Sequence, residues 1–542
     1  MKKKNAPAHK AALVADWQTL TRTFIRPEND DAKSILLKYM EQILFGLHEF
    51  LKHHVGFTEE VSLKELADRF TNTLISENPE KKLADVITDL IEDIAPHAVN
   101  VASPYFIGHM TSAIPFFMVH LKTIVAALNQ NVVKLETSKI VSVVEKQVLA
   151  KIHRLIYRKN RDFYDEHIQH PHTALGCFVE NGTLANISAL WVARNALFAP
   201  KNGFTGVEKE GISAAYKAYD TEKCVVLVSR LGHHSFNKAG GVLGIGNQNI
   251  VAVNVDENYR MHLVSLHKKI KELKKNNAKI LAVVGIAGTT ETGTVDPLEK
   301  LGEICADNGI HYHVDAAWGG PTLMSKKYRH MLAGIELADS VTIDGHKQLY
   351  MPMSCGMTYF KDPLIMDVIT YHANYVNRPG SVDLGIKSLS GSREANSLIL
   401  DCALKIMGSG GYALLIEHGI ETAGAFAEAI EKRPLFQLFT RPELNILTYR
   451  ICPPDMKQQL REGDAEQKKR INRRLNDINR TLQRLQREAG RSFVSRTTLT
   501  ASFLPDDGVV VLRAVIMNPM TDMPVLEKIL DEQEEIYQSA FI

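Results

Sequence analysis

The 542-residue chain has few cysteines and no long apolar run. Its six cysteines are scattered, without a Cys-x-x-Cys pair or metal-ligand spacing, so neither disulfides nor a zinc site is indicated. No stretch of about 18 consecutive apolar residues occurs, and the basic start MKKKNAPAHKAALVADW lacks the apolar core of a signal peptide. These absences predict a cytoplasmic protein without a membrane span.

The chain also lacks a strong charge of either sign. Its formal net charge is +2, with 23% charged and 45% hydrophobic residues, which argues against a general attraction to nucleic acid or membranes. The stretch 464–490 is a basic helix, but its apolar residues recur at alternating spacings of four and three: Ile471, Leu475, Ile478, Leu482 and Leu485. This pattern favours an amphipathic helix packed on a core over a nucleic-acid surface.

Hydrophobic patterning predicts three parts. Residues 1–103 have the apolar spacing of helices but no sheet to cover, so we expect them to cover a second copy of the chain. Residues 104–409 alternate β runs such as CVVLVS, ILAVVGIAG and SVTID with helical stretches, which predicts a mostly parallel sheet in a large α/β domain. Residues 410–542 combine strand runs with helices and predict a small α+β domain.

Two strand ends carry complementary chemistry. The run GIHYHV delivers Asp315, and small residues after it would let a flat group approach the backbone. The run SVTID ends at Asp344, and a turn at Gly345 presents His346 and Lys347. An amine and a carboxylate in one crevice suit pyridoxal phosphate, which needs an amine for its aldehyde and an anion beside its ring nitrogen. The alternative for Asp315 is a turn-forming residue after a buried strand, and Lys347 taken alone is better explained as a surface lysine after a turn.

Three more loops can complete such a site. The Asn-Gly-Thr at 181–183 precedes a helix whose N-terminus, with the Thr183 hydroxyl, can hold a phosphate. His233, in GHHSFNKAGG, can stack on the cofactor ring, and GTTETG at 288–293 is another strand-end loop. Each of these has a simpler explanation when taken singly, such as an ordinary N-cap or a buried histidine.

The ordered motifs NGTxAN, GHHSxxKAG, AGTTxxGxxDP, HVDAAWGG and DGHK resemble those of the group II pyridoxal-phosphate-dependent amino-acid decarboxylases. With SPYFIGHMTS, they are most similar to the bacterial pyridoxal-dependent aspartate 1-decarboxylases. The resemblance implies the fold-type I α/β architecture and a homodimer with active sites at the interface. It also implies decarboxylation of L-aspartate at its α-carboxylate to β-alanine. Glutamate decarboxylation to 4-aminobutyrate, or another decarboxylase or lyase reaction, is the alternative.

The resemblance also implies residue roles. Lys347 would bind the cofactor covalently, Asp315 would pair with its ring nitrogen, and His233 would stack on the ring. Tyr375, with Tyr371 in reserve, would return a proton to the substrate carbon. The implied cofactor-binding residues are Gly182, Thr183, His233, Thr289, Asp315, Ala317, His346 and Lys347.

Substrate carboxylates need cationic or donor partners, and the planar fork of arginine matches two oxygens. The candidates are Arg513, Arg393 and His109, although either arginine could instead form a structural ion pair. One departure concerns Asp344, because glutamate and aromatic decarboxylases commonly carry Asn-Pro-His-Lys where this chain has Asp-Gly-His-Lys. An anion at 344 cannot donate a hydrogen bond to phosphate unless it is protonated, so its role stays open.

Two other classes of protein fit less of the sequence. Another pyridoxal-phosphate enzyme, such as a desulfurase or aminotransferase, would keep Asp315 and Lys347 but would not predict this histidine motif and tyrosine loop. A binding protein that uses the basic helix would leave the strand-end loops unexplained.

Overall fold

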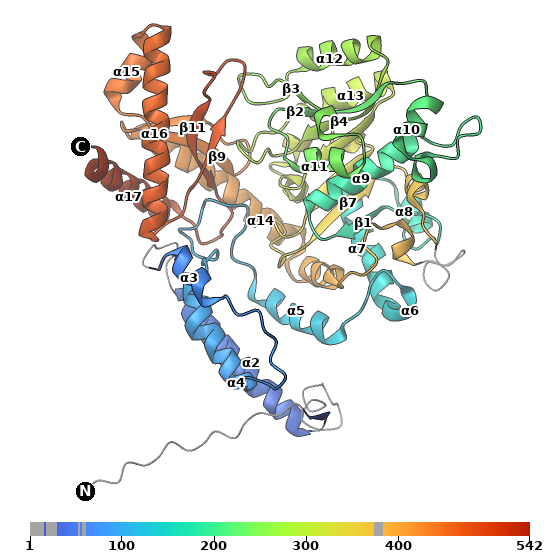
Figure 1. Ribbon diagram of the computed structural model, residues 1–542, viewed down its shortest axis with the longest axis horizontal. Coiled ribbons are helices and arrows are strands. Elements are labelled where there is room, and N and C mark those ends of the chain that lie inside the picture. The colour runs from blue at the N-terminus through green and yellow to red at the C-terminus, as the bar shows by residue number, and fades with distance from the viewer. Residues whose placement is uncertain (1–15, 18–29, 53–54, 57–60, 373–382) are drawn as a thin grey trace. The chain divides into compact units, whose positions relative to one another are not determined.

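The computed structural model describes residues 16–17, 30–52, 55–56, 61–372 and 383–542 (Figure 1). The chain forms two compact units. One consists of residues 1–106 with 484–493, and the other of residues 107–483 with 494–542. The three-part division predicted from the sequence stays a prediction.

The first unit is helical. Its elements are α2 (Asp30–Lys52), α3 (Leu63–Arg69), α4 (Leu83–Asp89), the π-helix η1 (Leu90–Ile94) and the 3₁₀ helix η2 (Ala95–His97). Ser62 begins α3 with a capping box, because its hydroxyl accepts from the Glu65 N–H while the Glu65 carboxylate accepts from the Ser62 N–H. Large apolar side chains nevertheless stay exposed on this unit, among them Phe45, Leu63, Phe70 and Ile75.

A seven-stranded sheet forms the centre of the second unit, in the order β1-β7-β6-β5-β4-β2-β3. β2 to β6 pair in parallel, and β7 is antiparallel to β6 and β1. The strands are β1 (Gly176–Val179), β2 (Lys223–Ser229), β3 (Ile250–Val253), β4 (Ala278–Ile286), β5 (His311–Asp315), β6 (Ser340–Asp344) and β7 (Gly356–Phe360). The predicted mostly parallel α/β sheet is confirmed.

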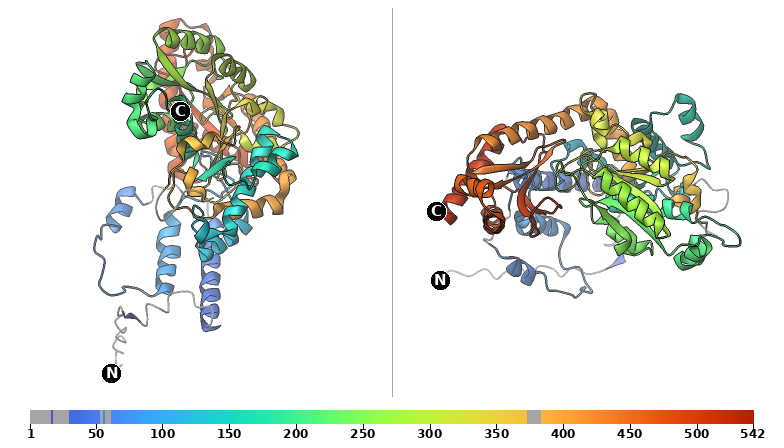
Figure 2. Two further views of the ribbon diagram at one scale, coloured as in Figure 1. Left: turned by 90° about the vertical axis from the view of Figure 1, so that its right-hand side faces the viewer. Right: turned by 90° about the horizontal axis from the view of Figure 1, so that it is seen from above.

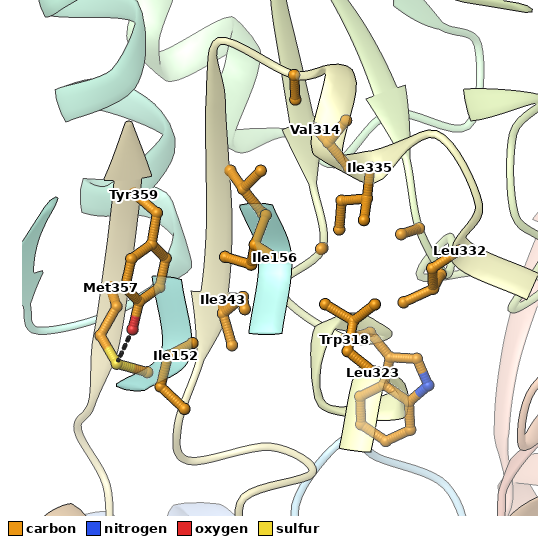
Figure 3. Packing of buried hydrophobic residues seen from close by; sticks show 14 of the residues in the cluster. Ile152, Ile156, Val314, Trp318, Leu323, Leu332, Ile335, Ile343, Met357 and Tyr359 are labelled. Atoms are coloured by element: carbon orange, nitrogen blue, oxygen red, sulfur yellow. Dashed lines mark hydrogen bonds between the residues drawn. The ribbon is translucent and has the colours of Figure 1, made fainter. Parts of the chain in front are cut away.

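Helices cover both faces of this sheet, which explains its continuous apolar strands. Val226 and Val228 of β2 pack with α9 (Gly182–Leu197), α10 (Val207–Ala218) and α11 (Ser235–Val242). Val225 and Leu227 point to the other face, which α7 (Ile140–Tyr157), α12 (Leu263–Lys275) and α13 (Leu298–Asn308) cover. Figure 3 shows part of that second core around Trp318 and Ile343. Successive side chains along a strand point to opposite faces of the sheet, so they contribute to two separate hydrophobic cores.

Shorter elements connect these layers. They are α5 (Phe116–Leu128), α6 (Leu135–Ser138), α8 (Arg161–His167), η3 (Asn247–Asn249), η4 (Gly320–Met324), η5 (Arg329–Leu332), η6 (Ile335–Leu337), η7 (Ile365–Ile369) and η8 (Leu384–Lys387).

A long helix, α14 (Asn396–Lys432), runs from the large sheet to the C-terminal elements (Figure 2). Gly408, with φ 63° and ψ 174°, breaks it into two helices. Among the described helices, α14 is long and apolar enough to cross a membrane, a test that core helices also pass. Its Tyr412, Ile416 and Ile420 lie in the main core, so packing accounts for its apolar character.

The C-terminal part has a four-stranded antiparallel sheet in the order β10-β11-β9-β8. Its strands are β8 (Phe436–Thr440), β9 (Ile446–Ile451), β10 (Ser495–Leu499) and β11 (Val509–Val515), and its helices are α15 (Pro454–Glu462), α16 (Ala465–Ala489) and α17 (Met523–Phe541). The predicted apolar stripe of the basic helix α16 is confirmed, since Ile471, Leu475, Ile478 and Leu482 are buried.

Candidate active site

A cavity of about 180 Å³ lies at the carboxyl ends of the parallel strands. Loops after β1, β2, β4, β5 and β6 converge there, as open α/β sheets require of a ligand site. The cavity is lined by Met110, Asn181, Gly182, Thr183, Asn186, Leu231, His233, Ile286, Gly288, Thr290, Asp315, Ala317, Trp318, Asp344, His346 and Lys347. The structure thus brings together seven residues predicted from the sequence: Gly182, Thr183, His233, Asp315, Ala317, His346 and Lys347.

Asp315 ends β5 as a buried carboxylate with both oxygens bonded. The Asn186 side-chain amide donates to Oδ2 over 3.0 Å, and the Ala317 backbone N–H donates to Oδ1 over 3.1 Å. These two donors fix the orientation of the carboxylate at the wall of the cavity.

His313 fixes the orientation of the Asn186 side chain. Burial lowers the pKa of His313 to about 3, although the Asp315 charge opposes this shift, so the ring is neutral near pH 7. Because the Asn186 amide group faces Asp315, its oxygen accepts from His313 Nε2 over 3.0 Å, and His313 Nδ1 accepts from Ser340 over 2.8 Å. A relay of neutral groups therefore holds Asp315 in place.

A tight turn after β6 places three polar side chains together. Lys347 Nζ lies 3.0 Å from Asp344 Oδ2, and His346 Nε2 lies 3.7 Å from the same oxygen. Gly345 is required between them, because a Cβ there would lie 2.6 Å from Cys355 Sγ. The turn therefore aims the Lys347 amine into the cavity beside a buried carboxylate.

The N-terminus of α9 forms another wall. Asn181 caps the helix, since its side chain accepts from the Leu184 N–H over 3.1 Å. Gly182 and Thr183 begin the helix and line the cavity, and N–H groups of a first turn have no acceptor within their own helix. Such an end, with the Thr183 hydroxyl beside it, suits a phosphate or another anion.

His233 lies on the loop between β2 and α11, and its Nδ1 accepts from the Ser235 N–H over 3.2 Å. Partial burial lowers its pKa, and the charges of His234 and Lys347 lower it further, while Asp315 and Asp344 oppose the shift. A flat, neutral ring at the cavity wall can stack on a planar group.

The loop after β4 differs in detail from the prediction. Thr289 does not line the cavity; it is buried in a cluster in which its hydroxyl bonds to those of Thr292 (2.6 Å) and Thr294 (3.1 Å). The neighbouring Thr290 lines the cavity instead. The loop therefore presents the second threonine of the motif, because the first one stabilises the loop itself.

Arg393 also lies elsewhere. Its guanidinium forms a two-pronged, buried ion pair with Glu145, with Nη1 2.9 Å from Oε2, and it borders a different cavity of about 360 Å³. Burial acts to lower the pKa of Arg393, but the Glu145 charge outweighs it and raises the pKa. This geometry favours the structural ion-pair alternative and removes Arg393 from the candidate substrate residues.

Arg513 stays a candidate. Its Nη1 donates to the Gly108 carbonyl (3.3 Å) and to Ser495 Oγ (3.0 Å), while its Nε has no partner within the described residues. Burial lowers its pKa to about 10, and the charge of Glu291 only partly opposes this. No carboxylate of the described chain lies within ion-pair distance of Arg513, so the described residues leave the charge of this buried cation without an ion-pair partner.

His109 is close enough to Arg513 and to the turn of Lys347 for their charges to affect its pKa. Although the residue is exposed, partial desolvation lowers its pKa, and the positive charges of Arg513, Lys347 and His346 lower it further. Glu291 is an acidic group. Burial raises its pKa, although the charge of Arg513 opposes this shift, and its Oε2 has no hydrogen-bond partner among the described residues. In the sequence, His109 and Glu291 directly adjoin Met110 and Thr290, which line the cavity.

Tyr375 lies outside the described residues. Tyr371, the reserve candidate, is exposed, and its backbone N–H donates to the Ile386 carbonyl over 3.0 Å. Both tyrosines stay predictions.

Sequence reasoning missed Asn186, His313 and Thr290. A signal for Asn186 was present, since it lies four residues after Gly182 and therefore on the same side of α9. His313 lies two residues before Asp315 and so points to the same face of β5.

Comparison with known proteins agrees with this geometry. Residues 66–452 match the family model described as the pyridoxal-dependent decarboxylase conserved domain. The chain belongs to the pyridoxal-dependent decarboxylase family. It is 44% identical over 529 residues to the aspartate 1-decarboxylase of Aliivibrio fischeri, covering 97% of this chain and 96% of that protein. It is 29% identical over 405 residues to the L-2,4-diaminobutyrate decarboxylase of Acinetobacter baumannii, covering 72% and 75%.

Solved structures share the fold of this decarboxylase. The apo form of mouse CSAD superposes with a TM-score of 0.79 at 21% identity, covering 93% of this chain and 99% of that one. A decarboxylase domain from Vibrio parahaemolyticus gives a TM-score of 0.78 at 20% identity, covering 97% and 100%. The predicted fold-type I architecture is confirmed.

The cavity fits the cofactor of the family, pyridoxal phosphate. Lys347 can hold its aldehyde carbon, the anchored Asp315 its ring nitrogen, and the first turn of α9 its phosphate. When bound, this cofactor supplies a conjugated ring that takes up electrons as carbon dioxide leaves an amino acid. The chain is a pyridoxal-phosphate-dependent amino-acid decarboxylase, a carboxy-lyase.

Proposed function

We propose that this decarboxylase removes the α-carboxylate of L-aspartate, giving β-alanine and carbon dioxide. The observation that carries the proposal is the 44% identity, over nearly the full length of both chains, to a protein named aspartate 1-decarboxylase. Other relatives are named for 2,4-diaminobutyrate and for acidic amino acids in general, so the substrate side chain is the part that needs a test.

The charges beside the cavity support an acidic substrate. Arg513 is a buried cation without a carboxylate at ion-pair distance in the described chain, and His109 adds a second donor near it. A carboxylate of the substrate would compensate the Arg513 charge through two parallel hydrogen bonds. A neutral aromatic side chain would leave that charge buried and unpaired.

The chain's own residues then have distinct tasks. Lys347 would hold the aldehyde carbon of the cofactor, Asp315 would accept a hydrogen bond from its ring nitrogen, and His233 would lie against its ring, while the cofactor would supply an electron sink. The residues around the substrate would select the bond that breaks by fixing the direction of its α-carboxylate. Tyr375 returns a proton to the α-carbon.

A homodimer in the cytoplasm is part of the proposal. Exposed apolar side chains on the helical first unit, such as Phe45 and Phe70, have no cover within that unit and suit a second copy of the chain. Sedimentation velocity of the loaded enzyme should give a dimer at working concentration, and an active monomer would contradict this.

The substrate test compares kcat/KM for L-aspartate, L-glutamate, L-2,4-diaminobutyrate and L-tyrosine, with carbon dioxide and the amine both measured. Aspartate should be preferred over glutamate by about 10-fold or more, since one methylene in a fitted pocket is worth about 1–3 kcal/mol. A preference for glutamate or diaminobutyrate would overturn the substrate and keep the decarboxylase chemistry. α-Alanine from aspartate, the product of loss of the β-carboxylate, or no carbon dioxide from any of these amino acids, would overturn the proposed reaction.

A further inference from the structure

Asp344 is a buried carboxylate that lies against the anion site at the start of α9. Its side chain lines the cavity, and the residue is 2% exposed. A Cβ placed on Gly182 would lie 2.6 Å from Asp344 Oδ2 and 3.0 Å from Oδ1, so the carboxylate touches the first residue of the helix. Oδ2 pairs with Lys347, whereas Oδ1 has no hydrogen-bond partner in the described part of the chain.

This position creates a conflict of charge. The first turn of α9, with the N–H groups of Gly182 and Thr183, is the part of the cavity that suits a phosphate. A phosphate dianion there would lie beside the ionised Asp344, and two anions in contact within a buried site cannot both stay charged without a large cost. A protonated Asp344 would remove the repulsion and donate a hydrogen bond.

We propose that Asp344 takes up a proton when the phosphate of the cofactor binds at the N-terminus of α9, and that its unpartnered oxygen then serves the phosphate. Asp344 is a positioning residue in this account. In the free protein its ionised carboxylate holds the Lys347 ammonium, and in the loaded protein its carboxylic acid holds the phosphate. The inference concerns cofactor binding and does not depend on which amino acid is the substrate.

The groups that face Asp344 support this proton uptake. Lys347 and His346 lie on its own turn, at 3.0 and 3.7 Å, and Lys347 supplies the nearest positive charge. His233, on the loop after β2, has a lowered pKa and is uncharged near neutral pH. Cys355, before β7, is also uncharged, because burial raises the pKa of its thiol to about 12. Neither of these two residues offers a charge to offset a second anion.

The probe for the test is pyridoxine 5′-phosphate, which carries the phosphate but has no aldehyde and cannot bond to Lys347. Calorimetric titrations at pH 7.5 in two buffers of different ionisation enthalpy count the protons taken up. At this pH a phosphate monoester, with its second pKa of about 6, is already a dianion in solution. The wild-type protein should take up about one proton per probe bound, and its affinity should fall by up to about tenfold per pH unit between pH 7 and 8.5.

Asp344→Asn should take up almost no proton and bind with little dependence on pH, because the amide donates without being protonated. Glu180→Gln is the matched control, since Glu180 precedes the same helix end but its carboxylate accepts from Ser390 over 3.0 Å; it should keep the wild-type proton count. Proton uptake that persists in Asp344→Asn, or is absent from the wild type, overturns the proposal. Asp344→Ser, which also lacks a carboxyl, replaces Asp344→Asn if that variant does not fold.

Discussion

The side-chain amide of Asn186 donates a hydrogen bond to Oδ2 of Asp315 over 3.0 Å, although 129 positions separate the two residues. One lies in the first turns of α9 and the other at the end of β5, so the packing of that helix on the sheet sets their contact. The orientation of the Asp315 carboxylate at the wall of the cavity thus depends on a residue that lies far from it in the sequence.

Removing this donor should weaken catalysis. Asn186→Ala leaves one oxygen of Asp315 without its partner, and a hydrogen bond to a charged group is worth about 1.5–3 kcal/mol. We expect kcat/KM to fall by about 10- to 100-fold, measured as carbon dioxide release. Ser188→Ala, buried on the same helix with a hydroxyl that has no partner in the described chain, should stay near the parental value. Parental activity of Asn186→Ala would refute this role.

Lys347 should be the point of cofactor attachment. Borohydride reduction of the loaded enzyme followed by peptide mapping should place the pyridoxyl group on Lys347, because its amine lines the cavity. Lys347→Arg should lose both the label and the activity, whereas Lys326→Arg, at an exposed lysine, should keep both. A label on another lysine in the wild type would refute the assignment.

Arg513 should determine the affinity for an acidic substrate. Arg513→Lys keeps a positive charge but loses the planar fork, so KM for L-aspartate should rise by about tenfold or more, the value of a charge-assisted hydrogen bond. The kcat/KM for a non-acidic amino acid should change less. Equal losses for both substrates would point to a structural role, and an unchanged KM for aspartate would exclude Arg513 from substrate binding.

Tyr375 should affect the fate of the substrate carbon and not the binding of the cofactor. Tyr375→Phe should keep the absorbance of the bound cofactor while amine formation falls and carbonyl side products rise, as expected when protonation is misdirected. Tyr371→Phe is the matched control on the same segment and should resemble the parent. If Tyr371→Phe loses amine formation while Tyr375→Phe resembles the parent, Tyr371 is the proton donor.

His153 should make the fold sensitive to acid. It is fully buried between Phe360 O (3.0 Å) and Tyr164 (2.9 Å), and burial lowers its pKa to about 4. Between pH 4 and the ordinary histidine pKa of about 6.5, this side chain is protonated in the unfolded chain but neutral in the native state. The free energy of unfolding is therefore highest above this window and falls as the pH drops through it.

Chemical denaturation at several pH values measures this effect. The free energy of unfolding of the wild type should fall more steeply toward low pH than that of His153→Gln, by about 1.4 kcal/mol per pH unit within the window. The exposed His330 is the control, and His330→Gln should keep the wild-type slope. Parallel slopes for wild type and His153→Gln would show that this histidine does not titrate as stated.

Much of the fold was predictable because its signals are local. The apolar runs that became β2, β4, β5 and β6 are short, bounded by turn residues, and separated by stretches with helical spacing. The meeting of the candidate residues at strand ends was predictable for the same reason, since parallel strands bring their carboxyl ends to one edge. The broken helix α14 was not predicted, because its apolar residues follow contacts with several distant elements.

The sequence by itself determined which candidate residues meet at one edge of the sheet, among them Asp315, Lys347 and the helix start at Gly182. Only the tertiary structure decided which charges are already paired. Arg393 and Glu145, 248 positions apart, neutralise each other in the interior, whereas Arg513 Nε has no hydrogen-bond partner in the part of the chain that the structure describes. Spacing along the chain cannot distinguish these two arginines, because ion pairing and burial depend on distances that exist only after the helices and sheets have packed.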